Sequence, residues 1–264
     1  MIVGDGGTIE LNGTGGGLYS TSSGANNYGI YLSSATLTAG NGGSLTNAIN
    51  FTGIGGTGLT GSHYGVYGAA SLSINLNGSG NSDIVNFTNC IGGTGGNSNY
   101  GVNLATDLTL AHGTLRFINL TGGGPSQSNH GLVITATIAA PVILGTDLYG
   151  GPGIGVVGTG NYGLYIGSGG TIGDATLSYL TLSGGSLGIG SSEVGIVVDA
   201  GGAIVVSSQG TITLIGMGGG LYSAATAQNY GVFINGGSLT AGNSITITGI
   251  GGVGTGLSES LHHG

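Results

Sequence analysis

Asn27-Tyr28-Gly29-Ile30-Tyr31-Leu32 decides the fold, because its core of an aromatic residue, a glycine and an aliphatic residue returns along the whole chain. Later copies begin at Tyr64, Tyr100, His130, Tyr162, Val194 and Tyr230, with spacings of 36, 36, 30, 32, 32 and 36 residues. Repetition with a period of 20–50 residues is typical of solenoids and stacked arrays. The sequence therefore predicts a repeat protein.

Composition favours a folded chain and limits what it binds. Of 264 residues, 65 are glycine, 3 are proline and 39% are hydrophobic. Disordered chains lack the apolar area that offsets ordering entropy, so this hydrophobic content favours a folded repeat. The chain has one Arg, Arg116, and no Lys, and its net charge is −8. Nucleic acids and anionic membrane surfaces attract clustered Lys and Arg, so we exclude both as partners.

Most copies contain three strand-like segments in the same order. The segment with the aromatic residue and glycine comes first, and a short segment around one aliphatic residue such as Leu37 comes second. An alternating segment such as Ile49-Asn50-Phe51 comes third, and a glycine-rich connector such as residues 53–58 follows it. The copy that begins at His130 shows no clear third segment of this form.

The alternation of apolar and polar residues has the period of two that strands require. Glycine is too frequent for helices, because each glycine inside a helix costs about 1 kcal/mol. Three short strands per copy predict an all-β parallel β-helix of about seven coils with Gly-rich loops, roughly 34 Å long at the usual strand spacing. We expect one β-helical repeat domain over residues 1–264. Two coils of about 18 residues per copy are the alternative, if the connector is itself a strand.

Alternation also assigns the faces of the first segment. The residues two and four positions after the aromatic one are nearly always aliphatic, so they are predicted to point inward. The aromatic residue shares their parity, which predicts a stack of aromatic rings at an inner corner. The preceding asparagine is predicted to form a ladder between coils. The glycine indicates either a close packing contact or an unusual backbone dihedral.

The outward column of this segment is partly aromatic and is predicted to be exposed. Its members are Tyr31, Tyr67, Asn103, Val133, Tyr165, Val197 and Phe233. Aromatic faces stack on sugar rings, so Tyr31, Tyr67, Tyr165 and Phe233 are the candidate ligand-binding residues. The third segment places Thr181, Thr213 and Thr246 in a second outward column, and regular threonine arrays are a known form of ice-binding surface.

Residues 236–249 carry a family resemblance, together with their echo at Leu37-Thr38-Ala39-Gly40. Their sequence resembles the glycine-rich strand repeats of bacterial autotransporter passengers and filamentous-haemagglutinin-like adhesins. The resemblance implies a right-handed β-helix that is secreted or displayed at the bacterial cell surface. It implies host or neighbouring-cell surfaces as partners, with glycans as candidate ligands. It also implies flanking repeats of the same chain and an outer-membrane barrel outside this fragment. Residues 261–264 stop where another copy is due, so we expect an excerpt of a longer protein.

Catalytic and metal-binding chemistry is not indicated by the sequence. Calcium-binding repeats need an Asp in every copy, but the aspartates here fall at different offsets within their copies. A polysaccharide-acting β-helix enzyme needs paired carboxylates, or calcium with a basic residue, on one face. His63, His130 and Cys90 are interpreted as structural residues, because no partner of suitable spacing accompanies them. We therefore expect no enzyme, no metal and no cofactor.

Two functional hypotheses remain. The first is a structural or adhesive segment of a bacterial fibre, whose function depends on length, stiffness and display. The second is a ligand-binding face, in which the aromatic column binds carbohydrate or the threonine column binds ice. Both columns are interrupted, which favours the first hypothesis.

Overall fold

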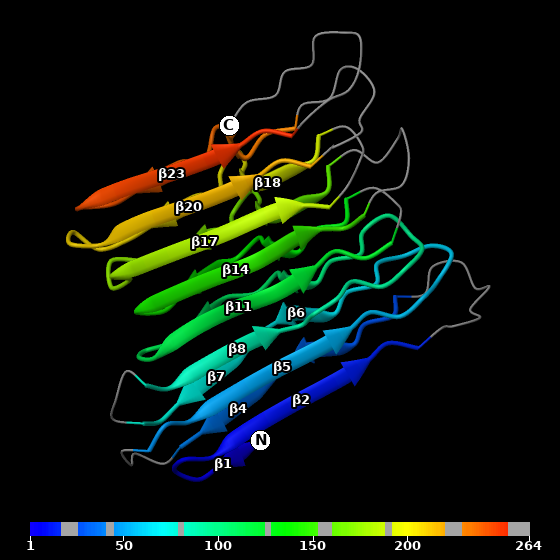
Figure 1. Cartoon of the computed structure of the whole chain (residues 1–264). Coiled ribbons are helices and arrows are strands. Elements are labelled where there is room, and N and C mark those ends of the chain that lie inside the picture. Colours follow the sequence, from blue (N-terminus) through cyan, green and yellow to red (C-terminus); the bar gives the residue numbers. More distant parts are fainter. Residues whose placement is uncertain are drawn as a thin grey trace, which may run out of the picture.

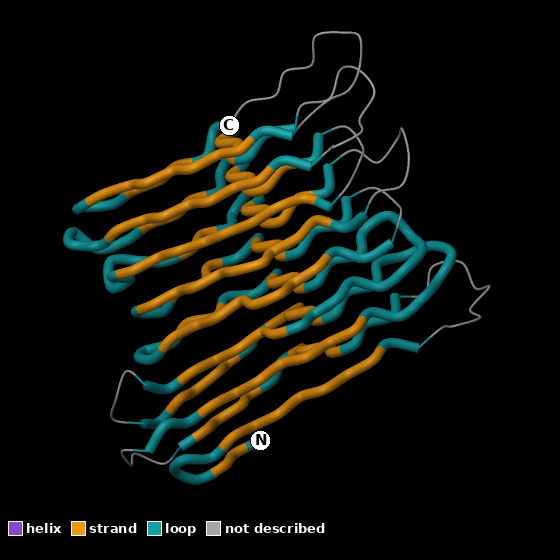
Figure 2. Tube along the Cα trace, in the orientation of Figure 1, coloured by secondary structure: helices purple, strands orange, loops and turns teal. Residues whose placement is uncertain are grey.

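The structure is a computed structural model that describes residues 1–16, 26–40, 45–78, 82–124, 128–152, 160–187, 192–219 and 229–252. Within these ranges the chain winds into a β-solenoid of parallel strands without any helix (Figures 1 and 2). These residues accordingly include no helix long and apolar enough to cross a membrane. The N-terminal strands lie at one end of the stack and β23 lies at the other (Figure 1).

The first sheet carries the segment with the aromatic residue and glycine in seven successive coils. Each strand pairs in parallel with the first-sheet strand of the next coil. Its strands are β3 (Ile30–Ser33), β6 (Val66–Ala70), β9 (Val102–Leu104), β12 (Leu132–Ile134), β15 (Tyr162–Ile166), β18 (Val194–Val198) and β21 (Val232–Ile234).

The second face holds the shortest strands and is split into two sheets. One comprises β1 (Ile2–Val3), β4 (Thr36–Ala39) and β7 (Ser73–Leu76). The other comprises β10 (Leu108–Thr109), β13 (Thr137–Ala139), β16 (Thr171–Ile172), β19 (Ala203–Val205) and β22 (Ser238–Thr240).

The third sheet is the longest, and its eight strands run through the whole stack (Figure 1). They are β2 (Thr8–Thr14), β5 (Ala48–Ile54), β8 (Ile84–Thr88), β11 (Thr114–Thr121), β14 (Val142–Gly150), β17 (Tyr179–Ser186), β20 (Thr211–Met217) and β23 (Ser244–Ile250). The coil that begins at His130 therefore has a third strand, β14, which the sequence pattern did not predict. Gly145 occupies an inward position of β14 and interrupts the apolar pattern by which such strands were recognised.

Each copy of the repeat forms one coil, which confirms the predicted β-solenoid with three strands per coil. The connectors bridge to one another a whole repeat away, as Thr57 does to Thr94 and Ser62 does to Ser98. The alternative of two coils per copy is therefore wrong. These bridges join residues 37 and 36 positions apart, about one full copy of the repeat, so the connector belongs to the same coil as the three strands that precede it.

One continuous core fills the interior, and it follows from strand alternation. On the third sheet, β5 buries Ile49 and Phe51 while Asn50 faces outward. Arg116 likewise lies on the outer face, between the buried Leu115 and Phe117. Inward aliphatic residues on the first sheet complete the core, as predicted for the positions two and four after the aromatic residue.

The corner between the third and first sheets brings two backbones into close contact. A β carbon at Gly131 would lie 2.7 Å from the carbonyl oxygen of Gly163 and 2.8 Å from that of Leu120. Real β carbons do not approach backbone oxygens this closely. Gly131 does not have a positive φ. The position therefore requires glycine because of the close contact and not because of an unusual backbone dihedral.

Candidate functional site

An aromatic ladder runs along the stack at the corner where each coil begins. Its rings stack in the order Tyr28, Tyr64, Tyr100, His130 and Tyr162, with centroid distances of 5.2, 4.8, 5.0 and 4.7 Å. Neighbouring ring planes differ by 7° to 20°. The predicted stacking between coils is confirmed, and offset stacks of this kind contribute about 0.5–1.5 kcal/mol per pair.

The rings of this ladder do not belong to the core cluster and lie on the outer side of the corner, so their predicted inward orientation is wrong, although Tyr64 and His130 are buried beneath neighbouring residues. Tyr28 lies 5.5 Å from the ring of Tyr31 and 5.1 Å from that of Tyr67, and both of these partners belong to the outward column. Most strands of the first sheet begin only after the glycine. Strand alternation therefore does not extend back through the corner to the aromatic residue.

The residue before the aromatic one is asparagine in most coils and points inward instead. Asn99, Asn129 and Asn161 are fully buried. The side-chain oxygen of Asn129 accepts from the backbone N of Asn99 at 3.2 Å and from its Nδ2 at 3.1 Å. The oxygen of Asn161 accepts from the backbone N of Asn129 at 2.8 Å. The predicted asparagine ladder is thus confirmed, as a buried polar column beneath the aromatic one.

Glu193 replaces asparagine in the coil of β18 and is also fully buried. Its Oε1 accepts from Asn161 Nδ2 at 3.0 Å, and its Oε2 accepts from the hydroxyl of Ser186. Its backbone N donates to Asn229 Oδ1 at 2.9 Å. The hydrogen-bonded column therefore continues across this coil, although the residue type changes.

The four candidate ligand-binding residues do not form one exposed column. Tyr31 is 56% exposed, and its ring lies 5.6 Å from that of Tyr67. Tyr165 and Phe233 are partly exposed and form a second group, which lies several coils away. The remaining positions of the column are buried: Asn103, Val133 and Val197. The structure therefore places the four candidates in two separate groups, and the prediction that the outward column is exposed is wrong for Asn103, Val133 and Val197.

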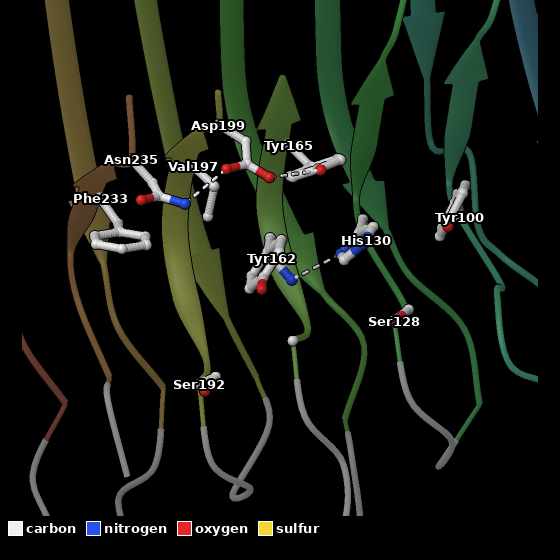
Figure 3. Close-up of a pocket in the computed structure, with 11 residues that line it drawn as sticks. Tyr100, Ser128, His130, Tyr162, Tyr165, Ser192, Val197, Asp199, Phe233 and Asn235 are labelled. Carbon is white, nitrogen blue, oxygen red and sulfur yellow. Dashed lines mark hydrogen bonds between the residues drawn. The ribbon is translucent and has the colours of Figure 1, made fainter. Parts of the chain in front are cut away.

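A hollow of about 430 Å³ opens over β15, β18 and β21, next to the second group (Figure 3). Tyr162, Tyr165, Val197, Asp199 and Phe233 all line it. Figure 3 shows Phe233 on one side of Val197, with Tyr162 and Tyr165 on the other. The volume is in the range of ligand pockets in proteins, which makes this hollow the main candidate site.

Asp199 is the charged group of the hollow. Its Oδ1 accepts from the backbone N of Ala200 at 2.9 Å and from Asn235 Nδ2 at 2.8 Å. Its Oδ2 accepts from the Tyr165 hydroxyl at 3.0 Å. The hydrogen bond from Ala200, together with those from Asn235 and Tyr165, lowers the pKa of Asp199 below its ordinary value. The hollow therefore contains a carboxylate that accepts hydrogen bonds at neutral pH.

His130 supplies an uncharged ring to the same face. Burial lowers the pKa of His130 from 6.5 to about 3, so the imidazole is neutral at neutral pH. Its Nδ1 accepts from the backbone N of Tyr162 at 3.1 Å, which assigns the ring proton to Nε2. Burial also raises the pKa of the Tyr162 hydroxyl. Neither ring adds charge to the hollow.

The threonine column predicted on the third sheet is present over three coils only. Thr181, Thr213 and Thr246 are in register on β17, β20 and β23. The same register continues through Leu144 and Arg116, whose side chains break the pattern. The column is therefore not a regular threonine array along the sheet.

Cys90 is fully buried, and burial raises its pKa to about 12, which fits the structural role expected for it. Asp83 is also buried and accepts from the backbone N of Asn47 at 2.8 Å. Its Oδ2 lies 3.4 Å from Nε2 of His112, an ion pair when that imidazole is protonated. In the described ranges, no three His, Cys, Asp or Glu side chains are grouped so as to hold a metal ion.

Sequence reasoning missed Asp199 and Asn235 as members of a site. Both follow a first-sheet strand, where polar residues are common in turns, so the residue type alone gives no signal. A signal was nevertheless available in the repeat. In the coil of β18, both Val194 and Val197 stand where the neighbouring coils have aromatic residues, and this substitution leaves space on the surface.

No family model matches the chain, and neither curated proteins nor solved structures gave a match in our comparisons.

Proposed function

We propose that this chain is a structural and adhesive segment of a secreted or cell-surface bacterial fibre. The observation that carries the proposal is the in-register stacking of the third sheet through eight strands. In such an array each coil is supported by its neighbours, so length and stiffness grow by adding coils. An elongated scaffold of this kind suits display at a distance from the cell surface.

The buried polar column and the aromatic ladder support the same proposal. Both repeat with the coil and hold successive coils in one register, as the bonds from Asn99 to Asn129 and from Asn129 to Asn161 illustrate. Charged residues make up 4% of the chain, and the single Arg is the one residue among them that is basic. These features favour a function based on shape and adhesion over one based on electrostatic attraction.

A carbohydrate-binding face is the second candidate function, and the hollow over β18 favours it. Aromatic side chains beside hydrogen-bonding groups suit sugars, which present both C–H faces and hydroxyl groups. Ice binding is less well supported, because the threonine column changes to Leu144 and Arg116 partway along the sheet.

Location in the native organism tests the proposed function directly. Intact cells of the bacterium that encodes the chain are treated with a protease that cannot enter them, and the chain is followed with an antibody. We expect its loss from intact cells, or its recovery from the culture medium, while a cytosolic marker stays intact. Protection of the chain until the cells are lysed would contradict a surface or secreted function.

A further inference from the structure

The coil of β18 interrupts both aromatic columns of the first sheet at the same level. Tyr165, Val197 and Phe233 are paired in register on three adjacent strands, and Tyr162 is paired with Val194. Val197 lines the hollow between its aromatic neighbours, and Val194 is 3% exposed at the position where the aromatic ladder would otherwise continue. We call this arrangement the valine slot: Val197 at its base, with Tyr162 and Tyr165 on one side and Phe233 on the other.

The walls of the valine slot are held in place by ring contacts. Tyr162 and Tyr165 lie 5.7 Å apart, and the ring of His130 stacks on Tyr162 at 4.7 Å. On the other side, Phe233 stacks on Tyr230 with a centroid distance of 4.9 Å and an interplanar angle of 24°. Each wall is therefore supported by another ring behind or beside it.

The spacing of the walls selects the thickness of the ligand. Tyr165 and Phe233 are two strands apart, which places their backbones about 9.6 Å from each other. Carbon atoms in contact lie about 3.5–4 Å apart, so two contacts occupy about 7–8 Å of this span. The thickness left between the walls is about 2 Å, which a puckered saturated ring fills. A flat nucleobase is thinner and leaves one wall without full contact.

Polar groups at one side of the slot match sugar hydroxyls. Asp199 accepts hydrogen bonds, and the exposed Asn235 both donates and accepts, so adjacent hydroxyl groups find partners there (Figure 3). Asp199 is an anion, and the single Arg of the chain, Arg116, lies on the third sheet. An acidic sugar would meet repulsion without a compensating cation, so the ligand should be neutral.

We propose that the valine slot binds one neutral pyranose residue of a glycan, with its ring between Tyr165 and Phe233 and its hydroxyls on Asp199 and Asn235. This inference rests on the adhesive part of the proposed function and names its ligand class. The aromatic pair Tyr31 and Tyr67 is not part of the site.

Saturation-transfer NMR on the purified chain tests the inference, with methyl glycosides of neutral hexoses as probes. We expect transfer to the ring C–H protons of at least one of them. Val197→Tyr, which fills the slot, should abolish the signal, and Phe233→Ala should weaken binding about tenfold. Asp199→Asn keeps the shape and should also weaken binding. Tyr31→Ala is the matched control and should bind as the wild type does.

Three results would overturn the inference. They are no transfer to any neutral hexose, equal binding by wild type, Val197→Tyr and Phe233→Ala, or a stronger response to nucleosides or uronic acids than to neutral hexosides. Circular dichroism of each variant verifies its fold, and Phe233→Ala and Asp199→Asn remain informative if Val197→Tyr does not fold. Because the purified chain is used, failure here leaves the surface-location experiment unaffected, so the two proposals fail separately.

Discussion

Phe51 and Phe87 stack face to face in the core, with ring centroids 4.6 Å apart and planes within 10° of each other. They are register partners on β5 and β8, and both are fully buried. Phe117 continues the stack in the next coil at 5.3 Å. One side-chain position of the repeat thus forms an internal stack of three rings, in which Phe87 contacts both of the others.

Removing the middle ring of this column should be strongly destabilising. We expect Phe87→Ala to lower the free energy of unfolding by about 3–5 kcal/mol, because it leaves a cavity between two rings that cannot close on each other. Urea denaturation followed by circular dichroism measures the loss. The control is Asn86→Ala, which removes an outward hydrogen bond of 2.8 Å to Asn50 and should cost about 1 kcal/mol or less. Similar losses in the two variants would contradict this account of the core.

The corner glycines predict a second stability effect. Gly131→Ala places a β carbon against the carbonyl oxygens of Gly163 and Leu120, and neither backbone can move without breaking sheet pairing. We expect a loss of more than about 4 kcal/mol, or an insoluble product. Gly4 has open space around its β position, so Gly4→Ala should be neutral. Soluble yield and thermal melting compare the two, and a stable Gly131→Ala protein would disprove the close-contact explanation.

Periodicity was sufficient to predict the solenoid, because the apolar-polar alternation and the period of 30–36 residues can both be read from the order of the residues. The repeat predicted three strands per coil and the asparagine ladder. It failed to predict β14, where Gly145 takes an inward position that an apolar residue usually holds. A strand in a stack is stabilised by pairing with its neighbours, so β14 forms despite a weak pattern of its own.

The candidate site was less predictable, because it depends on geometry at a corner. Parity placed Tyr28 in the interior, but the chain turns at Gly29 and the ring lies outside with Tyr31. The site itself arises where aromatic residues are absent. Val194 and Val197 give no signal as single residues, because their effect depends on which strands flank them in space.

The buried asparagines give a third prediction. Asn129→Ala removes the acceptor of two hydrogen bonds from Asn99 and leaves those buried donors without it. We expect a loss of about 2–4 kcal/mol, as two buried groups lose a partner. The exposed Asn97 provides the control, since Asn97→Ala should change stability by less than about 0.5 kcal/mol. Chemical denaturation distinguishes the variants, and a neutral Asn129→Ala would show that the ladder does not stabilise the fold.

The buried imidazole of His130 predicts how stability depends on pH. Its pKa is about 3 in the folded chain against 6.5 when unfolded, so below pH 6.5 the unfolded chain takes up a proton that the folded chain does not. The contribution of His130 to the free energy of unfolding is fully present above pH 6.5, and it declines as the pH falls toward 3. At pH 5 the expected loss is about 2 kcal/mol relative to pH 8.

His130→Tyr isolates this effect, because tyrosine occupies the equivalent position in most coils and stays uncharged over this range. The variant loses the acceptor for the Tyr162 backbone N, so it should be less stable than the wild type at pH 8. Its stability should nevertheless fall less between pH 8 and pH 5, by about 2 kcal/mol. Urea midpoints across this range measure the difference in slope. Parallel curves for the two proteins would mean that His130 takes up its proton equally in the folded and unfolded states, contrary to its burial between Tyr100 and Tyr162.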